Sequence, residues 1–159
     1  MLRVVFGIAM ALVAASAASA GVVKPREGWV VIDTRHSFTG LVARLEAAVK
    51  AEKMGLVTFA SASDGAKAAG FAIPGNRVVG VFRNDFARRM LNTSISAGIE
   101  APIRFYLAEN SDGTATLAYK KPTFVFMPYF DEGGEALRSL AGELDAIFAK
   151  IAEASAREP

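Results

Sequence analysis

The residues best suited to chemistry lie in one basic stretch, Arg83-Asn84-Asp85-Phe86-Ala87-Arg88-Arg89. Asn84 can cap a helix here, and the backbone N–H groups at a helix start can hold phosphate or carboxylate. Guanidinium groups add charge and bidentate hydrogen bonding for the same anions. Arg77 and Arg104 would lie near this stretch in space if the strands that carry them are neighbours. Asp85, however, already supplies the negative charge that a helix start favours, so salt-bridged arginines on a solvated helix are the alternative.

Two functional readings follow from this stretch. The first is a binding site for a small anionic or hydrophobic ligand, with candidate residues Arg83, Asn84, Asp85, Arg88, Arg104 and Tyr106. The second is an enzyme acting on a small anionic substrate through Arg83-Asn84-Asp85. No residue is identified as catalytic, because the chain has no Gly-x-Ser-x-Gly elbow and no carboxylate pair typical of glycosidases. His36, the one imidazole, is either a general base or a polar residue at a helix start.

The composition excludes several classes of site. The chain has no cysteine and one histidine. It therefore lacks the ligands for a thiolate zinc site, an iron–sulfur cluster or a multi-histidine metal site, and it has no disulfide or cysteine nucleophile. Neither a calcium loop nor a phosphate-binding glycine loop occurs. We predict neither a metal nor a cofactor.

A second candidate site is the aromatic segment from Phe124 to Phe130. Its candidate interaction residues are Phe124, Phe126, Tyr129 and Phe130. Exposed aromatic patches often mark a partner or ligand site. The alternative is a segment that covers an edge of a sheet, where its rings are buried. A second copy of the chain could cover such an edge, so we also consider a homodimer, including a purely structural one without ligand.

The first twenty residues have the layout of a secretory signal peptide. Arg3 precedes an apolar run, and Ala18-Ser19-Ala20 gives small residues before a predicted cut after Ala20. The apolar run is too short for a membrane anchor. The mature protein is expected in the periplasm or secreted, with no membrane span. Its net charge falls from +2 to +1 with the loss of Arg3, which argues against non-specific nucleic-acid binding.

The rest of the chain has the sequence patterns of strands and helices. A flexible lead-in is expected over 21–28, a single domain over 29–153 and a frayed tail over 154–159. A helix capped by Ser37 and ended by Gly55, and a helix after Gly134, carry apolar stripes at helical spacing. Shorter helical turns are expected near 61–70 and from Asn84, and an irregular segment over 122–130. The expected strands are 29–34, 56–60, 78–82, 103–108 and 114–119.

These elements predict an α+β fold. Two long amphipathic helices and one mostly antiparallel sheet are expected to pack with both helices on one sheet face. The opposite face then carries mixed side chains such as Arg104, Tyr106, Thr114 and Thr116.

Several features stand in a characteristic order along residues 28–150. They are the opening strand, the Ser37-Phe38 helix start, the helix end at Gly55, the stretch Val81-Phe82-Arg83-Asn84-Asp85-Phe86 and the segment Gly98-Ile99-Glu100-Ala101-Pro102-Ile103-Arg104. In this order and spacing the chain resembles the bacterial domain-of-unknown-function 302 family. The resemblance implies a β-α-β4-α order similar to the TATA-binding-protein-like fold, and it does not imply DNA binding. Many members of the family carry Cys-Asn-Pro where this chain has Arg83-Asn84-Asp85, so a thiol-based role does not transfer.

The leading expectation is thus an exported, non-enzymatic domain that binds a small ligand or a protein partner.

Overall fold

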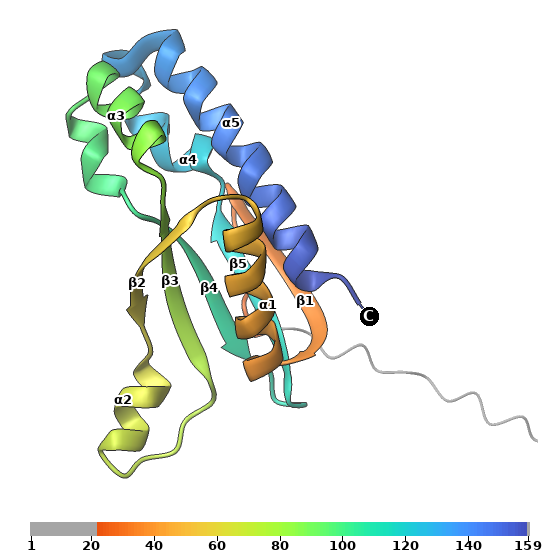
Figure 1. The fold of residues 1–159 in the computed structure, drawn as a ribbon. Coiled ribbons are helices and arrows are strands. Elements are labelled where there is room, and N and C mark those ends of the chain that lie inside the picture. The colour runs from red at the N-terminus through yellow and green to blue at the C-terminus, as the bar shows by residue number, and fades with distance from the viewer. Residues whose placement is uncertain (1–21, 159) are drawn as a thin grey trace, which may run out of the picture.

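Five antiparallel strands form a single sheet in the computed structural model, which describes residues 22–158. Their order across the sheet is β1-β5-β4-β3-β2, and Figure 1 shows them as one twisted layer. The expected signal peptide lies outside the described residues. The strand bounds are β1 Trp29–Ser37, β2 Gly55–Ala60, β3 Asn76–Phe82, β4 Ile103–Glu109 and β5 Thr114–Lys120.

Two long helices cover one face of this sheet. They are α1 (Phe38–Ala51) and α5 (Phe130–Ala156), and they lie side by side in front of the strands in Figure 1. This arrangement confirms the predicted α+β class. The shorter elements are α2 (Ala62–Ala68), α3 (Asn84–Thr93), α4 (Pro122–Phe126) and the two 3₁₀ turns η1 (Ser96–Glu100) and η2 (Met127–Tyr129).

Local sequence explains the start of α1 and the β4–β5 hairpin. The Ser37 Oγ accepts a hydrogen bond from the Gly40 N–H at 3.3 Å, which is the predicted N-cap. At the hairpin, the Asn110 N–H donates to the Thr114 carbonyl at 2.8 Å. Gly113 takes a φ of +82°, a conformation that glycine adopts without strain.

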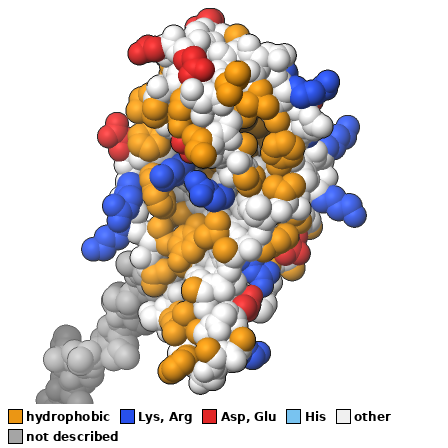
Figure 2. All heavy atoms as spheres, turned by 90° about the vertical axis from the view of Figure 1, so that its left-hand side faces the viewer, with side chains coloured by type: hydrophobic (Ala, Val, Ile, Leu, Met, Phe, Trp, Pro, Cys, Tyr) orange, Lys and Arg blue, Asp and Glu red, His pale blue; other side chains and the backbone are white. Residues whose placement is uncertain are grey.

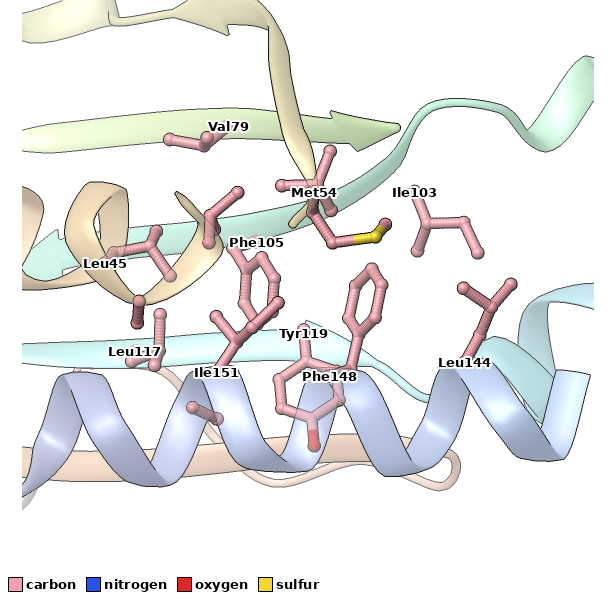
Figure 3. Packing of buried hydrophobic residues seen from close by; sticks show 14 of the residues in the cluster. Leu45, Met54, Val79, Ile103, Phe105, Leu117, Tyr119, Leu144, Phe148 and Ile151 are labelled. Atoms are coloured by element: carbon pink, nitrogen blue, oxygen red, sulfur yellow. The ribbon is translucent and has the colours of Figure 1, made fainter. Parts of the chain in front are cut away.

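The core lies between the sheet and the two long helices. The predicted apolar stripes of α1 and α5 are buried against alternate residues of the strands. Figure 3 shows Phe105 of β4, Tyr119 of β5 and Phe148 of α5 gathered at its centre. Among residues 22–158, no helix covers the opposite sheet face, as Figure 1 shows.

The segment 122–130 is helical, which corrects the expectation of an irregular segment. Pro122 occupies the first turn of α4, where a missing N–H costs no hydrogen bond. The Asp145 carboxylate on α5 accepts hydrogen bonds from the Thr123 N–H at 2.9 Å and from its hydroxyl at 2.7 Å. These bonds satisfy the start of α4 and fix it to α5. Pro128 lies in η2, so no continuous α-helix runs through the segment.

The chain end also differs from expectation, because α5 continues to Ala156 through part of the expected tail 154–159. Ser155 is fully buried, and its hydroxyl donates to the Ile151 carbonyl at 2.6 Å. The Arg44 guanidinium of α1 donates to the Ser155 carbonyl at 2.9 Å. A cation bonded to the last carbonyls stabilises a helix end, which explains the extension.

The lead-in is held against the sheet at both ends of its described part. The Val22 N–H donates to the Asn110 Oδ1 at 3.2 Å, and the Lys121 N–H donates to the Gly28 carbonyl at 2.8 Å. The segment expected to be flexible thus contacts the domain. Within residues 22–158, none of the helices has the length and apolar character needed to cross a bilayer.

Candidate functional site

The open face of the sheet carries two of the predicted ligand-binding residues. Phe105 is fully buried beneath the helices. Because successive side chains of a strand point to opposite faces, its neighbours Arg104 and Tyr106 belong to the open face. The strand register places Tyr106 opposite Ala118 on β5 and opposite Val78 on β3.

A hollow of about 390 Å³ lies on this face. That volume is in the range of sites for small organic molecules. Small and apolar residues contribute to its wall, and the polar groups stand among them. The lining residues are Trp29, Val78, Glu100, Ile103, Arg104, Tyr106, Ala118, Tyr119, Lys120 and Val125.

The cations of the hollow are available to a ligand. Arg104 is exposed, and among the described residues no carboxylate lies within ion-pair distance of its guanidinium. The Lys120 Nζ lies 5.6 Å from the centre of the Trp29 ring, a cation–π contact that leaves its charge uncompensated. Arg26 approaches the same ring at 5.9 Å.

Among the described residues, Glu100 alone lines this hollow with a carboxylate, and a neighbour occupies that carboxylate. The Glu100 Oε1 accepts a hydrogen bond from the Tyr129 hydroxyl at 2.8 Å. This bond favours the neutral phenol and raises the pKa of Tyr129.

The basic stretch on α3 favours the alternative of salt-bridged arginines. The Arg83 guanidinium donates two hydrogen bonds to the Asp85 carboxylate, at 2.8 and 3.2 Å, and lies over the Phe86 ring at 4.4 Å. The bond from Arg83 lowers the pKa of Asp85. Arg89 makes a second bidentate pair with Glu143 of α5, at 2.8 and 2.6 Å.

The predicted cap at Asn84 is wrong. Arg83 is the N-cap residue, in an extended conformation with no side-chain cap bond, and Asn84 is the first residue of the helix. Asp85 in the first turn instead provides the favourable charge near the helix start. Asn84 and Arg88 are exposed on α3.

Arg83 also borders a second, apolar cavity beneath α3. Its volume is about 30 Å³, close to that of one water molecule, and Phe86, Met90 and Phe148 are among its lining residues. Arg104 and Tyr106 do not line it. The six predicted residues therefore separate into a group on α3 and a pair on the open sheet face. Arg77 joins neither, because it pairs with Asp64 at 3.1 Å and Glu46 at 3.8 Å.

The aromatic segment is largely packing. Phe126 is 2% exposed, and Phe124, Tyr129 and Phe130 are half-buried. Phe130 lies beneath the Arg138 guanidinium at 4.4 Å. The burial of these rings thus favours the alternative prediction, a segment whose rings are covered, over an exposed aromatic patch.

Apolar exposure is greater elsewhere, on β2, on the loop between α2 and β3, and from α3 to η1. Val57 and Phe59 of β2 are 50% and 55% exposed, and Ile95 and Ile99 are each 80% exposed. Figure 2 shows this side of the molecule, with hydrophobic side chains spread over much of it and basic groups among them.

Sequence reasoning missed Trp29 and Lys120. They lie opposite each other in the β1–β5 register, on the same sheet face as Arg104 and Tyr106. Each stands at an end of its strand, and the alternation of β5 extended by one residue would have placed Lys120 on the open face. Among the described residues, no cluster of acidic or histidine side chains could hold a metal ion.

Comparison with known proteins agrees with the architecture. A solved structure described as the crystal structure of an uncharacterized conserved protein DUF302 from Bacillus stearothermophilus shares 20% sequence identity with a TM-score of 0.71, over 83% of this chain and 100% of that chain. At that identity the likeness concerns the fold. No curated protein matches the chain. The family described as "Domain of unknown function DUF302" matches residues 30–155. The chain therefore belongs to the DUF302 family.

Proposed function

We propose that this protein is an exported, non-enzymatic module that binds a small organic anion on the open face of its sheet. The observation that carries the proposal is Arg104, exposed in the 390 Å³ hollow and without an ion-pair partner among the described residues. A guanidinium group matches the planar geometry of a carboxylate and can bind it through two hydrogen bonds.

The rest of the hollow suits an anion with an apolar body. Val78 and Val125, which are half-buried, offer apolar surface beside Arg104. Lys120 adds a second positive charge, and Glu100 is engaged by Tyr129. A monoanion such as a carboxylate with a ring or short chain fits this combination of charge and surface.

Catalysis through Arg83-Asn84-Asp85 receives less support. The bidentate bond from Arg83 keeps Asp85 charged by lowering its pKa, and a general base works best with a pKa near the operating pH. Tyr106, predicted together with these residues as a ligand-binding candidate, lies in the sheet-face hollow instead.

Titration calorimetry with benzoate, and thermal unfolding in its presence, test the binding proposal. We expect benzoate to bind the purified protein and to raise its melting temperature by mass action. Arg104→Met should abolish both effects, whereas Arg88→Met, which removes the same charge on α3, should preserve them. Absence of benzoate binding, or equal binding by Arg104→Met, would overturn the proposal.

Export is tested separately. The apolar segment ending at Ala20 supports a cleaved signal peptide. We expect the protein in the periplasmic or secreted fraction, and intact mass measurement should give a chain that begins at Gly21. A full-length chain that stays in the cytoplasm contradicts this part of the proposal.

Homodimerisation stays a prediction. The segment 124–130 that suggested it is mostly covered within the chain, and the exposed apolar residues Val57 and Phe59 lie on the sheet-edge strand β2 instead. Light scattering of the purified protein decides between one chain and two.

A further inference from the structure

A second hollow adjoins the first on the same sheet face. It measures about 470 Å³. The lead-in contributes Val22, Val23, Lys24 and Arg26 to its wall, and β4 contributes Ala108. Both hollows are bordered by Trp29 and Tyr106.

The strands beneath the two hollows carry small residues. Tyr106 lies opposite Ala118, and the next pair on the same face is Ala108 opposite Thr116. Ala108, Thr116 and Ala118 are at most 5% exposed, so the surface that both hollows share is that of Trp29 and Tyr106. A ligand longer than the first hollow would reach the second across these two side chains.

Positive charge is present in both hollows. Arg104 and Lys120 line the first, while Lys24 and Arg26 line the second. None of these four forms an ion pair with any residue that the structure describes. Within the part of the chain that the structure describes, Glu100 is the one acidic residue that lines either hollow, although acidic and basic residues are nearly balanced in the full sequence, at 16 and 18.

Trp29 contacts one cation from each hollow. The Lys120 ammonium of the first hollow and the Arg26 guanidinium of the second both lie within 6 Å of its ring, at 5.6 and 5.9 Å. Trp29 and Tyr106 line both hollows, so their aromatic rings form an apolar waist where the hollows meet.

The lead-in is hydrogen-bonded to the rest of the domain on both sides of its two cations, Lys24 and Arg26. The bond from Val22 to Asn110 and the bond from Lys121 to Gly28 hold its two ends to the sheet. Lys24 and Arg26 lie between these anchors, so the second hollow is built from two well-separated parts of the chain.

We propose that the two hollows form one elongated site for an amphiphilic dianion with a carboxylate at each end of an apolar chain. This inference rests on the proposed function, because it assigns one carboxylate to Arg104 and Lys120. It places the other carboxylate at Lys24 and Arg26 and the apolar chain across the waist between Trp29 and Tyr106.

Calorimetric titration with benzoate, decanoate and decanedioate tests the proposal. We expect decanedioate to bind at least about tenfold more tightly than decanoate, because only the dianion reaches both pairs of cations. The double variant Lys24→Gln/Arg26→Gln should reduce decanedioate affinity to that of decanoate and leave benzoate binding unchanged. The double variant Lys67→Gln/Lys150→Gln, with the same change in net charge on α2 and α5, should bind all three probes as the natural protein does.

The outcomes separate the two proposals. If benzoate binds in an Arg104-dependent way but decanedioate is bound no more tightly than decanoate, the elongated site is wrong and the proposed function stands. An unchanged decanedioate affinity in Lys24→Gln/Arg26→Gln likewise overturns the elongated site alone. If none of the three probes binds, both proposals fail.

Discussion

The ring of Phe105 on β4 stacks on the ring of Phe148 on α5, with centroids 4.7 Å apart and planes 13° from parallel. Tyr119 of β5 tilts against both rings, at 5.1 and 5.6 Å. This contact joins the sheet to the long helix and commits Phe105 to the covered face. Arg104 and Tyr106, on either side of it, are thereby directed to the open face where the proposed ligand binds.

Removal of the Phe148 ring should strongly destabilise the domain. Phe148 is 1% exposed, so Phe148→Ala leaves a cavity against Phe105 and Tyr119. We expect a loss of about 3–5 kcal/mol in the free energy of unfolding, measured by urea denaturation. Phe148→Leu retains most of the volume and should cost less. A loss below about 1 kcal/mol for Phe148→Ala would show that the ring contact is not central to stability.

The Arg89–Glu143 ion pair should lower the pKa of Glu143 while adding little to the free energy of unfolding. The hydrogen bond from Arg89 lowers the pKa of Glu143, so the pair stabilises the fold above the ordinary glutamate pKa and loses this effect as pH falls through the lowered value. Both side chains are nearly half exposed, and solvent screening limits the coupling to about 0.2–1 kcal/mol.

Two measurements check this pair. Nuclear magnetic resonance titration should show the pKa of Glu143 returning toward its ordinary value in Arg89→Met. A double-mutant cycle of Arg89→Met and Glu143→Gln gives the coupling energy. An unchanged pKa of Glu143 in Arg89→Met would be inconsistent with the ion pair.

Gly28, where the lead-in joins β1, should tolerate no side chain. Its φ is +71°, and a Cβ placed there would lie 2.1 Å from the Phe124 ring. Gly28→Ala should therefore combine backbone strain of about 1–2 kcal/mol with overpacking of about 1–3 kcal/mol. Gly113→Ala is the matched control, since Gly113 has a φ of +82° with no atom near its Cβ position. Equal unfolding free energies for the two variants would refute the close approach of Phe124.

The order of elements was predictable because apolar periodicity dominates this sequence. The stripes of α1 and α5 and the alternation around Phe105 and Leu117 are local patterns, and burial of these residues follows directly from them. The helix over 122–126 was not predictable in the same way. It depends on hydrogen bonds from Thr123 to Asp145, which lies 22 residues away in the chain.

The candidate site was only partly predictable for a similar reason. Alternation alone placed Arg104 and Tyr106 together on the open face. The pairing of Arg89 with Glu143 depends on how α3 packs beside α5, whereas Arg104 lies on β4 and has no ion-pair partner among the described residues. No local sequence pattern indicates the pairing of Arg89 with Glu143. The sequence therefore did not distinguish the paired Arg89 from Arg104.

The buried phenol of Tyr119 should cause the protein to lose stability at alkaline pH. Burial of its phenol, with smaller contributions from Asp145 and Glu153, raises the pKa of Tyr119 from 10.0 to about 12. The unfolded chain then ionises first, so the stabilising effect is complete below pH 10 and is lost as pH rises toward 12. Urea denaturation over this range should show a steeper loss of stability in the natural protein than in Tyr119→Phe, which lacks the ionisable hydroxyl. Parallel pH profiles for the two proteins would mean that the Tyr119 phenol is solvated, in conflict with its position beside Phe105 and Phe148.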